Sequence, residues 1–481
     1  MSRRIHHPWL LAATLAMLAG GLQAQPYDTP PPPVAPRPLH IGAPTEQSLP
    51  NGLRVVVAER RGVPLVSARL LVLAGSEFDP PQRSGLASMT AGLLTRGTLQ
   101  RSAPALVNAA EALGGSLDSG AAWHQVSVSI TVTTPQLPAA LALVSEVTRQ
   151  PAFAQDEIER YRIQALDEMK VAYAEPRVVA GMVAQRALYG EGSYGHPVAG
   201  TPASLPRITR DDVLKLHAAS YRPDNAVLVL AGDIDLATAL KLARQHFGGW
   251  NKPAGAVPAA GPATGSGWSD TTVVVDMPGS GQAGVVVVLP ALTANAPDRT
   301  AGMVSNVVLG SGYSSRLNQE IRIKRGLSYG ASSVLDARRE AGALRIEVQT
   351  KNPSAPEVLG LINTELDRMA SAPVPADELA ARKATLIGNF SRALETTSGL
   401  NAQVAGLVVA GLTPAELPQR IDRINAVGPA EVQAFAAKYF DSSRRRAVIA
   451  GVASDFEAAL KPSRVLKQEG LDLESVDALK H

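Results

Sequence analysis

This 481-residue chain has eight histidines and no cysteine, and this limits the chemistry that its side chains can perform. Because cysteine is absent, disulfides, thiolate metal sites, a cysteine nucleophile and a lipid-bearing N-terminal cysteine are all excluded. No two of the eight histidines lie four residues apart, the spacing at which one helical face presents two imidazoles to zinc. The histidines are His6, His7, His40, His124, His196, His217, His246 and His481. The residues themselves therefore predict no metal centre of the helical two-histidine type.

Other catalytic and nucleotide-binding motifs are weak as well. The chain has no Gly-x-Ser-x-Gly motif, although residue order alone leaves a Ser/His/Asp set open. Gly310-Ser311-Gly312 lacks the spacing and the lysine of a phosphate-binding loop, and a tight turn into the following helix is the better interpretation. His196 precedes a proline and His217 lies within a predicted helix, so core or capping roles are expected for both.

Composition and charge indicate a folded chain with a large core. Hydrophobic residues make up 45% and charged residues 19%, which excludes long disorder for most of the chain. At roughly 100–200 residues per domain, the length predicts two to four domains. Lysine and arginine number 46 against 43 aspartates and glutamates, an excess too small to indicate a nucleic-acid partner.

The N-terminal segment has the layout of a secretory signal peptide. Arg3 and Arg4 precede the apolar run Trp9–Ala19, and small residues ending at Ala24 offer a cleavage site. The run is too short to span a bilayer, so no stable membrane anchor is expected. Residues 1–24 are thus predicted to be removed, and the mature chain is predicted to be periplasmic or secreted. Residues 25–45 are rich in proline and are interpreted as a stiff spacer.

The chain contains the same unit twice. Ile208–Leu236 and Gly428–Phe456 each read as an amphipathic helix, a polar turn and an apolar strand ending in glycine. Aligning Gly232 with Gly451 gives an offset of 219 residues. The same offset aligns three further pairs, which are Val213 with Val432, Leu216 with Phe435 and Tyr221 with Phe440. An internal duplication is therefore predicted.

The front halves of the two units also correspond, because each begins with two predicted strands. These strands are Leu53–Glu59 and Leu65–Leu73 in the first unit, and Thr272–Met277 and Ala283–Leu289 in the second. The uniformly apolar Val285–Val288 predicts a central strand. The interpretation is α+β, with two homologous domains that each consist of a mostly antiparallel sheet covered by helices on one face. The predicted boundaries are a domain at 46–251, a linker rich in Pro, Ala and Gly at 252–267, a domain at 268–465 and a tail at 466–481.

Four segments on this duplicated frame carry a family resemblance. They are Ser84–Thr98, Tyr194–Gly200, His217–Asn225 and Gly310–Tyr329. Together they resemble the insulinase–pitrilysin family of zinc peptidases, in the short form with two homologous domains per chain. The resemblance covers nearly all of residues 46–465. It implies that each subunit is a half-shell and that two subunits enclose a chamber.

The metal motif of that family, His-x-x-Glu-His, is degenerate here. Ser88 stands at the position of the first histidine, Ala91 at that of the general base and Gly92 at that of the second histidine. A hydroxyl, a methyl group and a hydrogen do not form a zinc ligand set. Glu168 lies where the third ligand of the family would fall, and a solvated or paired helix residue is the favoured interpretation. No catalytic residue of the zinc motif, and no metal, is therefore expected in this chain.

The substrate-binding residues of the family are matched in the second domain. Arg322 and Tyr329 match a pair that, in the family, reaches the scissile region of a peptide bound at the zinc of the other half. A guanidinium and a phenol can both donate hydrogen bonds to a carbonyl oxygen that gains negative charge. Gly310, Ser311 and Gly312 match a glycine-rich stretch that can also contact substrate, which is kept as a lesser hypothesis.

The resemblance thus implies a non-metal-binding accessory subunit of a heterodimeric periplasmic zinc metallopeptidase. A homologous zinc-bearing subunit would supply the metal, a peptide would be the substrate, and the chain would be inactive alone. The alternative is a non-enzymatic scaffold or peptide-binding envelope protein. An independent peptidase with an unrecognised site is a third, less favoured hypothesis.

Overall fold

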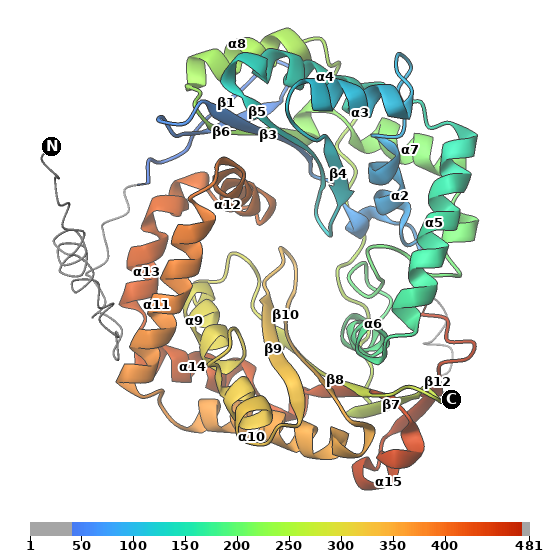
Figure 1. Cartoon of the computed structure of the whole chain (residues 1–481), viewed down its shortest axis with the longest axis vertical. Helices are drawn as coiled ribbons and strands as arrows, with labels where there is room; N and C mark the ends of the chain where they lie inside the picture. The colour runs from blue at the N-terminus through green and yellow to red at the C-terminus, as the bar shows by residue number, and fades with distance from the viewer. Residues whose placement is uncertain (1–40, 474–481) are drawn as a thin grey trace, which may run out of the picture. The chain divides into compact units, whose positions relative to one another are not determined.

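The computed structural model describes residues 41–473. The predicted signal peptide (1–24), all but the end of the proline-rich spacer (25–45) and the last part of the tail (466–481) lie outside the described residues. Within 41–473, no helix combines the length and the apolar character that crossing a membrane requires. The described residues form two six-stranded sheets with helices packed on both (Figure 1).

The first sheet uses strands from the first part of the chain only. Its spatial order is β1-β2-β6-β3-β5-β4, and neighbours are antiparallel except β2 and β6, which are parallel. The strands are β1 (Thr45–Ser48), β2 (Arg54–Glu59), β3 (Leu65–Val72), β4 (Asp118–Ala121), β5 (Val126–Thr133) and β6 (Ala226–Gly232).

The second sheet has the same plan. Its order is β12-β7-β11-β8-β10-β9, with β7 parallel to both β11 and β12 and the other neighbours antiparallel. The strands are β7 (Thr272–Asp276), β8 (Ala283–Ala291), β9 (Ser328–Asp336), β10 (Gly342–Thr350), β11 (Arg446–Gly451) and β12 (Arg464–Lys467). The predicted central strand is confirmed, because β8 lies between β11 and β10.

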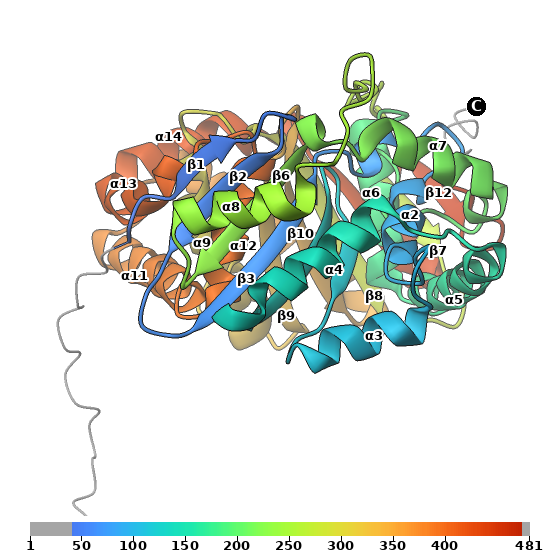
Figure 2. The same cartoon turned by 90° about the horizontal axis from the view of Figure 1, so that it is seen from above.

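Helices follow the strands in both halves. Those before the second sheet are α2 (Leu86–Leu93), α3 (Ala103–Ala112), α4 (Leu137–Arg149), α5 (Gln155–Tyr173), α6 (Pro176–Tyr189), α7 (Arg210–Ser220) and α8 (Leu236–Phe247). The helices that follow the first strand of the second sheet are α9 (Arg299–Leu309), α10 (Ala355–Ser371), α11 (Ala376–Ala393), α12 (Thr397–Val409), α13 (Arg420–Ala426), α14 (Pro429–Tyr439) and α15 (Glu457–Leu460). Figure 2 shows α4 and α8 crossing the first sheet.

The internal duplication is confirmed by equivalent elements. Strands β6 and β11 end at Gly232 and Gly451, the residues that the offset aligns. Val213 in α7 and Val432 in α14 are both fully buried, as a shared amphipathic pattern requires. The predicted α+β class with mostly antiparallel sheets is therefore correct.

Helices cover each sheet on two faces, rather than on the one face that was expected. Each half packs its own helices on one face: α4 and α8 on the first sheet, and α10 on the second. The opposite face of each sheet is covered by a helix from the other half (Figure 1). Leu400 and Val404 of α12 pack against Val229 of β6, while Val179 and Val183 of α6 pack against β8 and β11. Each half thus contributes one helix, α6 or α12, to the sheet of the other half. This exchange of helices explains why β6 and β8 are apolar on both faces.

Candidate functional site

Helix α2 carries the segment that matches the zinc motif, and its start is firmly anchored. Gly85 precedes the helix with φ 92°, a conformation that favours glycine, and a Cβ atom there would lie only 2.8 Å from the carbonyl oxygen of Ala199. The Asp79 carboxylate accepts hydrogen bonds from the backbone N–H groups of Gly85 at 2.9 Å and of Ala87 at 2.8 Å. A carboxylate at this end of a helix satisfies free donors and complements the helix dipole. The start of α2 is thus held in place, although the helix carries none of the zinc-binding side chains of the family motif.

The structure places Ser88, Ala91 and Gly92 in surroundings that do not fit zinc. The Ser88 hydroxyl donates a hydrogen bond to the carbonyl oxygen of Val198 at 2.7 Å, and Ala91 is fully buried. A Cβ atom at position 92 would overlap Cε2 of Tyr161 and lie 3.1 Å from its Cδ2. The space that a histidine side chain would need is therefore filled by the Tyr161 ring.

Tyr161 stays a neutral phenol in this position. It lies on α5, two turns before Glu168, and the guanidinium of Arg96 sits 5.6 Å from its ring centroid. Burial raises the pKa of Tyr161, and the nearby charge of Glu168 adds to the rise. Glu168 itself is exposed and accepts a hydrogen bond from Gln164 at 2.9 Å. Among residues 41–473, no group of three His, Asp or Glu side chains is arranged to hold a metal ion.

Arg322 and Tyr329 lie close together on the second half of the chain. The Arg322 guanidinium carbon lies 5.4 Å from the centroid of the Tyr329 ring, and Tyr329 is 93% exposed. Arg322 belongs to a short π-helix, Asn318–Ile323, and π-helical turns are frequent at functional sites. The pair therefore presents two hydrogen-bond donors to whatever lies against this surface.

Tyr313 joins this pair, and the sequence had not singled it out. Its ring centroid lies 4.9 Å from the Arg322 guanidinium carbon, and the residue is 64% exposed. Arg322 is thus in contact with two exposed aromatic rings, an arrangement that restrains its side chain through cation–π attraction. In the sequence, the only sign of this role was that Tyr313 lies within the glycine-rich segment.

The stretch Gly310 to Gly312 supports the neighbouring strand edge. The Gly310 carbonyl accepts a hydrogen bond from the N–H of Ser333 at 3.1 Å, and a Cβ atom on Gly310 would lie 2.6 Å from that nitrogen. Gly312 has φ 113°, and its carbonyl accepts from the Asn318 amide at 3.0 Å. Ser311 lies between them, partly buried. These contacts agree with the tight-turn interpretation, and substrate contact remains a prediction.

One arrangement resembles a hydrolytic triad but is closed to substrate. His124 lies 2.6 Å from a carboxylate oxygen of Glu77 through Nδ1 and 3.2 Å from the Tyr194 hydroxyl through Nε2. Tyr194 is fully buried, and burial raises its pKa to about 12. A hydroxyl that is both protonated and inaccessible does not serve as a nucleophile. Arg339 from the second half also donates to Glu77, so the cluster links the two halves.

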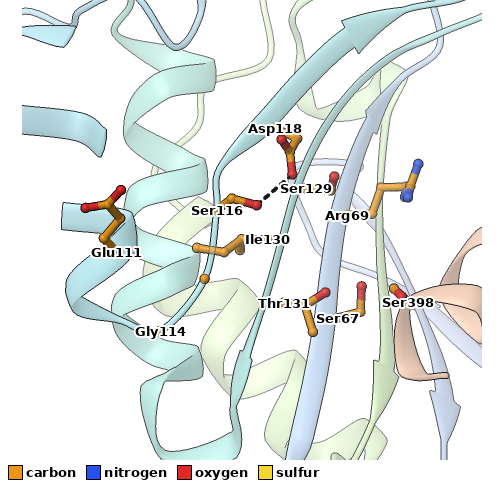
Figure 3. Close-up of a pocket in the computed structure, with 11 residues that line it drawn as sticks. Ser67, Arg69, Glu111, Gly114, Ser116, Asp118, Ser129, Ile130, Thr131 and Ser398 are labelled. Carbon is orange, nitrogen blue, oxygen red and sulfur yellow. Dashed lines mark hydrogen bonds between the residues drawn. The ribbon is translucent and has the colours of Figure 1, made fainter. Parts of the chain in front are cut away.

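A polar hollow of about 630 Å³ lies over β3, β4 and β5 (Figure 3). Hydroxyls such as Ser67 and Ser129 line it, and Ser116 donates to Asp118 at 3.1 Å. None of the residues that line it is a histidine, so its serines have no imidazole base. The hollow gives no support to a Ser/His/Asp set.

Family models and relatives agree with the resemblance. Residues 54–202 match the model of Insulinase (Peptidase family M16), and residues 207–386 match the Peptidase M16 inactive domain. An uncharacterised zinc protease of Mycobacterium tuberculosis is 30% identical over 358 residues, covering 74% of this chain and 81% of the relative. The mitochondrial-processing peptidase subunit beta of Rattus norvegicus is 24% identical over 402 residues, covering 81% of each chain.

A solved structure has the same architecture. The peptidase M16 inactive domain from Pseudomonas fluorescens superposes with a TM-score of 0.78 and 25% identity, covering 85% of this chain and 98% of the other. Both family models match in the expected order, and a relative at 30% identity spans most of the chain. The chain is therefore a member of the insulinase family of peptidases, peptidase family M16.

Proposed function

We propose that this chain is the non-metal-binding accessory subunit of a heterodimeric zinc metallopeptidase of the bacterial envelope. Its role is to bind a peptide and to supply Arg322 and Tyr329 to an active site whose zinc belongs to a homologous partner subunit. The chain alone has no peptidase activity in this proposal. The observation that carries it is the contrast between a filled metal position in the first half and an exposed donor pair in the second.

The filled metal position supports the proposal that this chain binds no zinc and is inactive alone. Several relatives are named zinc proteases, so the family implies zinc. The residues of this chain do not fit that metal, because the Tyr161 ring occupies the space beside Gly92 and the Ser88 hydroxyl is engaged by Val198. A peptidase that includes this chain must therefore take its metal from another polypeptide.

The exposed pair of Arg322 and Tyr329 supports the proposal that this chain binds the substrate. A carbonyl oxygen of the scissile peptide gains negative charge as its carbon is attacked. The Arg322 guanidinium and the Tyr329 hydroxyl can both donate hydrogen bonds to that oxygen. Tyr329 is 93% exposed and Arg322 rests against its ring, so the pair lies at the surface, where a second subunit can present its substrate.

The heterodimer and the location rest on further observations. A relative is named as one subunit of a processing peptidase, which supports a role for this chain within an assembly. The signal-peptide layout of residues 1–24 supports export to the periplasm. A cysteine-free sequence suits that oxidising compartment.

Reconstitution tests the proposal. The purified chain is mixed with a homologous subunit that carries an intact His-x-x-Glu-His motif, and cleavage of a fluorogenic peptide is followed. We expect no cleavage by this chain alone and chelator-sensitive cleavage by the pair. A complex that forms but never cleaves peptides would favour the non-enzymatic scaffold or peptide-binding role, and chelator-sensitive cleavage by this chain alone would favour an independent peptidase.

A further inference from the structure

A small cavity of about 80 Å³ lies between helical segments of the second half. It is lined by the first turn of α9, the end of α12, and the stretch that runs from the 3₁₀ turn Pro414–Gln419 into α13. These elements gather on one side of the molecule (Figure 1). The cavity has about half the roughly 150 Å³ of an engineered cavity that binds benzene, so it suits a small polyatomic ion. We name it the three-arginine cavity.

Three guanidiniums and one carboxylate line this cavity. They belong to Arg299, Arg420, Arg423 and Glu416. One oxygen of Glu416 accepts hydrogen bonds from Nη2 of Arg299 and from Nη1 of Arg423, at 2.8 Å each. The wall therefore has two formal positive charges in excess, and every residue in this count lines the cavity. The other lining residues are uncharged, namely Thr300, Met303, Leu407, Leu417 and Ile424.

The aspartates next to these arginines in the sequence leave the excess charge in place. Asp298, directly before α9, pairs with Lys438 at 3.0 Å. Asp422 is exposed, and neither aspartate lines the cavity. Burial lowers the pKa of Arg420, and the charge of Arg299 adds to this fall, so the two guanidiniums lie close enough to repel each other. An anion between them would remove this repulsion.

The guanidiniums of Arg299 and Arg420 keep free donors that a ligand can reach. Arg420 is held in place, because it packs 4.7 Å from the Phe390 ring centroid and its Nη1 donates to Gln403 at 2.8 Å. Nε and Nη1 of Arg299 and Nη2 of Arg420 have no hydrogen-bond partner within residues 41–473. Nε of Arg420 is also unpaired and is closed to solvent, whereas these three nitrogens are not. They therefore retain accessible surface.

The directions from which the charges approach favour a tetrahedral ion. Arg299 opens α9, whereas Arg420 and Arg423 lie on α13, so donors reach the cavity from two helices. Four oxygens of a tetrahedral ion can accept from both sides, whereas a planar carboxylate offers two oxygens that suit one guanidinium. The positive end of the α9 dipole adds to the attraction. The side chains of Arg299 and Arg423 are 23% and 44% exposed, so the charged wall reaches the surface.

We infer that the three-arginine cavity binds one small tetrahedral anion of the phosphate or sulfate class, between Arg299, Arg420 and Arg423. The small volume and the apolar remainder of the wall favour the free ion over a phosphate ester. The bound ion joins the start of α9 to α13. It thereby also fastens α12, which lies on the first sheet, to the second half. The inference does not depend on the proposed function.

Calorimetry tests the inference with inorganic phosphate. Phosphate is titrated into the mature chain at an ionic strength that sodium chloride holds constant, which separates binding from screening. We expect saturable binding of one phosphate per chain, together with a saturable rise in Tm, because a ligand of the folded state stabilises it. Absence of saturable binding for both phosphate and sulfate would overturn the inference. Phenyl phosphate should bind at least about tenfold more weakly, and equal binding would overturn the assignment to a free ion.

Two variants and a control locate the site. Arg299→Gln and Arg423→Gln should each weaken phosphate binding about tenfold or more, because each removes a positive charge and a charge-assisted donor. Arg177→Gln is the matched control and should bind phosphate as the parent chain does. Arg177 is 47% exposed and pairs with Glu347 at 2.9 Å, whereas Arg423 is 44% exposed and pairs with Glu416 at 2.8 Å.

Unchanged affinity in either variant would overturn the site, and so would equal weakening in the control. Arg423 is nearly half exposed, so its variant should fold, and its unfolding temperature without phosphate checks this. These titrations need no partner subunit and no peptide. Their failure is therefore distinct from a failure of the reconstitution.

Discussion

The ring of Tyr161 occupies the place into which the side chain of residue 92 would project, because a Cβ atom on Gly92 would overlap its Cε2. Loss of the metal ligands is therefore accompanied by packing that fills their space. Restoring the ligand types alone would not restore the site, since a histidine at position 92 would have to displace a partly buried ring.

The first prediction concerns this packing. The variant Ser88→His, Ala91→Glu, Gly92→His should bind no stoichiometric zinc, whereas the same variant with Tyr161→Ala should bind it. The physical reason is steric, because the two imidazoles reach one metal ion only after the ring is removed. Zinc content after dialysis, measured by mass spectrometry, checks both. Tyr161→Ala alone is the control, and stoichiometric zinc in the triple variant would contradict the packing argument.

A second prediction concerns the exchanged helix α12. Asn401 is fully buried, and its amide donates to the carbonyl oxygens of Ser67 and Val229 at 2.9 Å each. Its oxygen accepts from Nε of Arg69 at 3.2 Å. Asn401→Ala should lower the free energy of unfolding by about 2–4 kcal/mol, because it leaves buried polar groups unpaired.

Urea denaturation measures this loss. Ala402→Ser, at the next and exposed position of the same helix, is the control and should change stability by less than about 0.5 kcal/mol. If Asn401→Ala were as stable as the control, the contact between α12 and the first sheet would not contribute as described.

The third prediction is a dependence of stability on pH. His217 lies in α7, where its Nε2 donates to the Thr148 carbonyl at 2.8 Å and its ring packs 4.5 Å from that of Tyr221. Burial lowers the pKa of His217 in the folded chain. The unfolded state, with a pKa of about 6.5, therefore takes up the proton first, and stability falls as pH falls below that value.

His217→Gln should flatten this loss of stability between pH 7 and pH 5. The glutamine amide can still donate to Thr148, but it does not titrate. Part of the slope should remain, because burial also lowers the pKa of His246. The measurement is the free energy of unfolding at several pH values, and identical slopes for the variant and the parent chain would refute the assignment.

Strands β2, β3, β6, β7, β8 and β11 and the duplication could be predicted because their signals are local. An apolar strand ending in glycine recurs at Gly232 and Gly451, and tertiary packing preserves that pattern in both halves. The exchange of α6 and α12 could not be predicted, since an apolar helix face indicates burial without naming the sheet that buries it. No strand was predicted at β1, β4, β5, β9, β10 or β12. Of these, β1, β4 and β12 have four residues each, and so few residues carry little periodicity.

Only those residues of the candidate site that belong to a recognisable sequence motif could be predicted. Ser88, Ala91 and Gly92, and likewise Arg322 and Tyr329, were singled out by the match of their segments to motifs of the family, and their roles stay predictions. The roles of Tyr161 and Tyr313 depend on contacts between residues distant in sequence, such as the approach of Tyr161 on α5 to Gly92 on α2. Spacing along the chain contains no information about such contacts.

The last prediction concerns the donor pair. In an assembled complex with a zinc-bearing partner, Arg322→Ala should lower kcat/KM for peptide cleavage by about 100-fold to 1,000-fold, the usual effect of removing one oxyanion donor. Tyr329→Phe should lower it in the same direction, because only the hydroxyl is lost. Lys324→Ala, which removes an exposed cation paired with Glu320 on the same turn, is the matched control and should cleave normally.

The most direct test of the central claim is therefore the cleavage rate of the Arg322→Ala complex beside that of the Lys324→Ala complex. The account predicts a loss of two to three orders of magnitude in the first and none in the second, with complex formation unchanged in both. Equal rates in the two complexes would contradict the claim that this chain completes the active site of its partner.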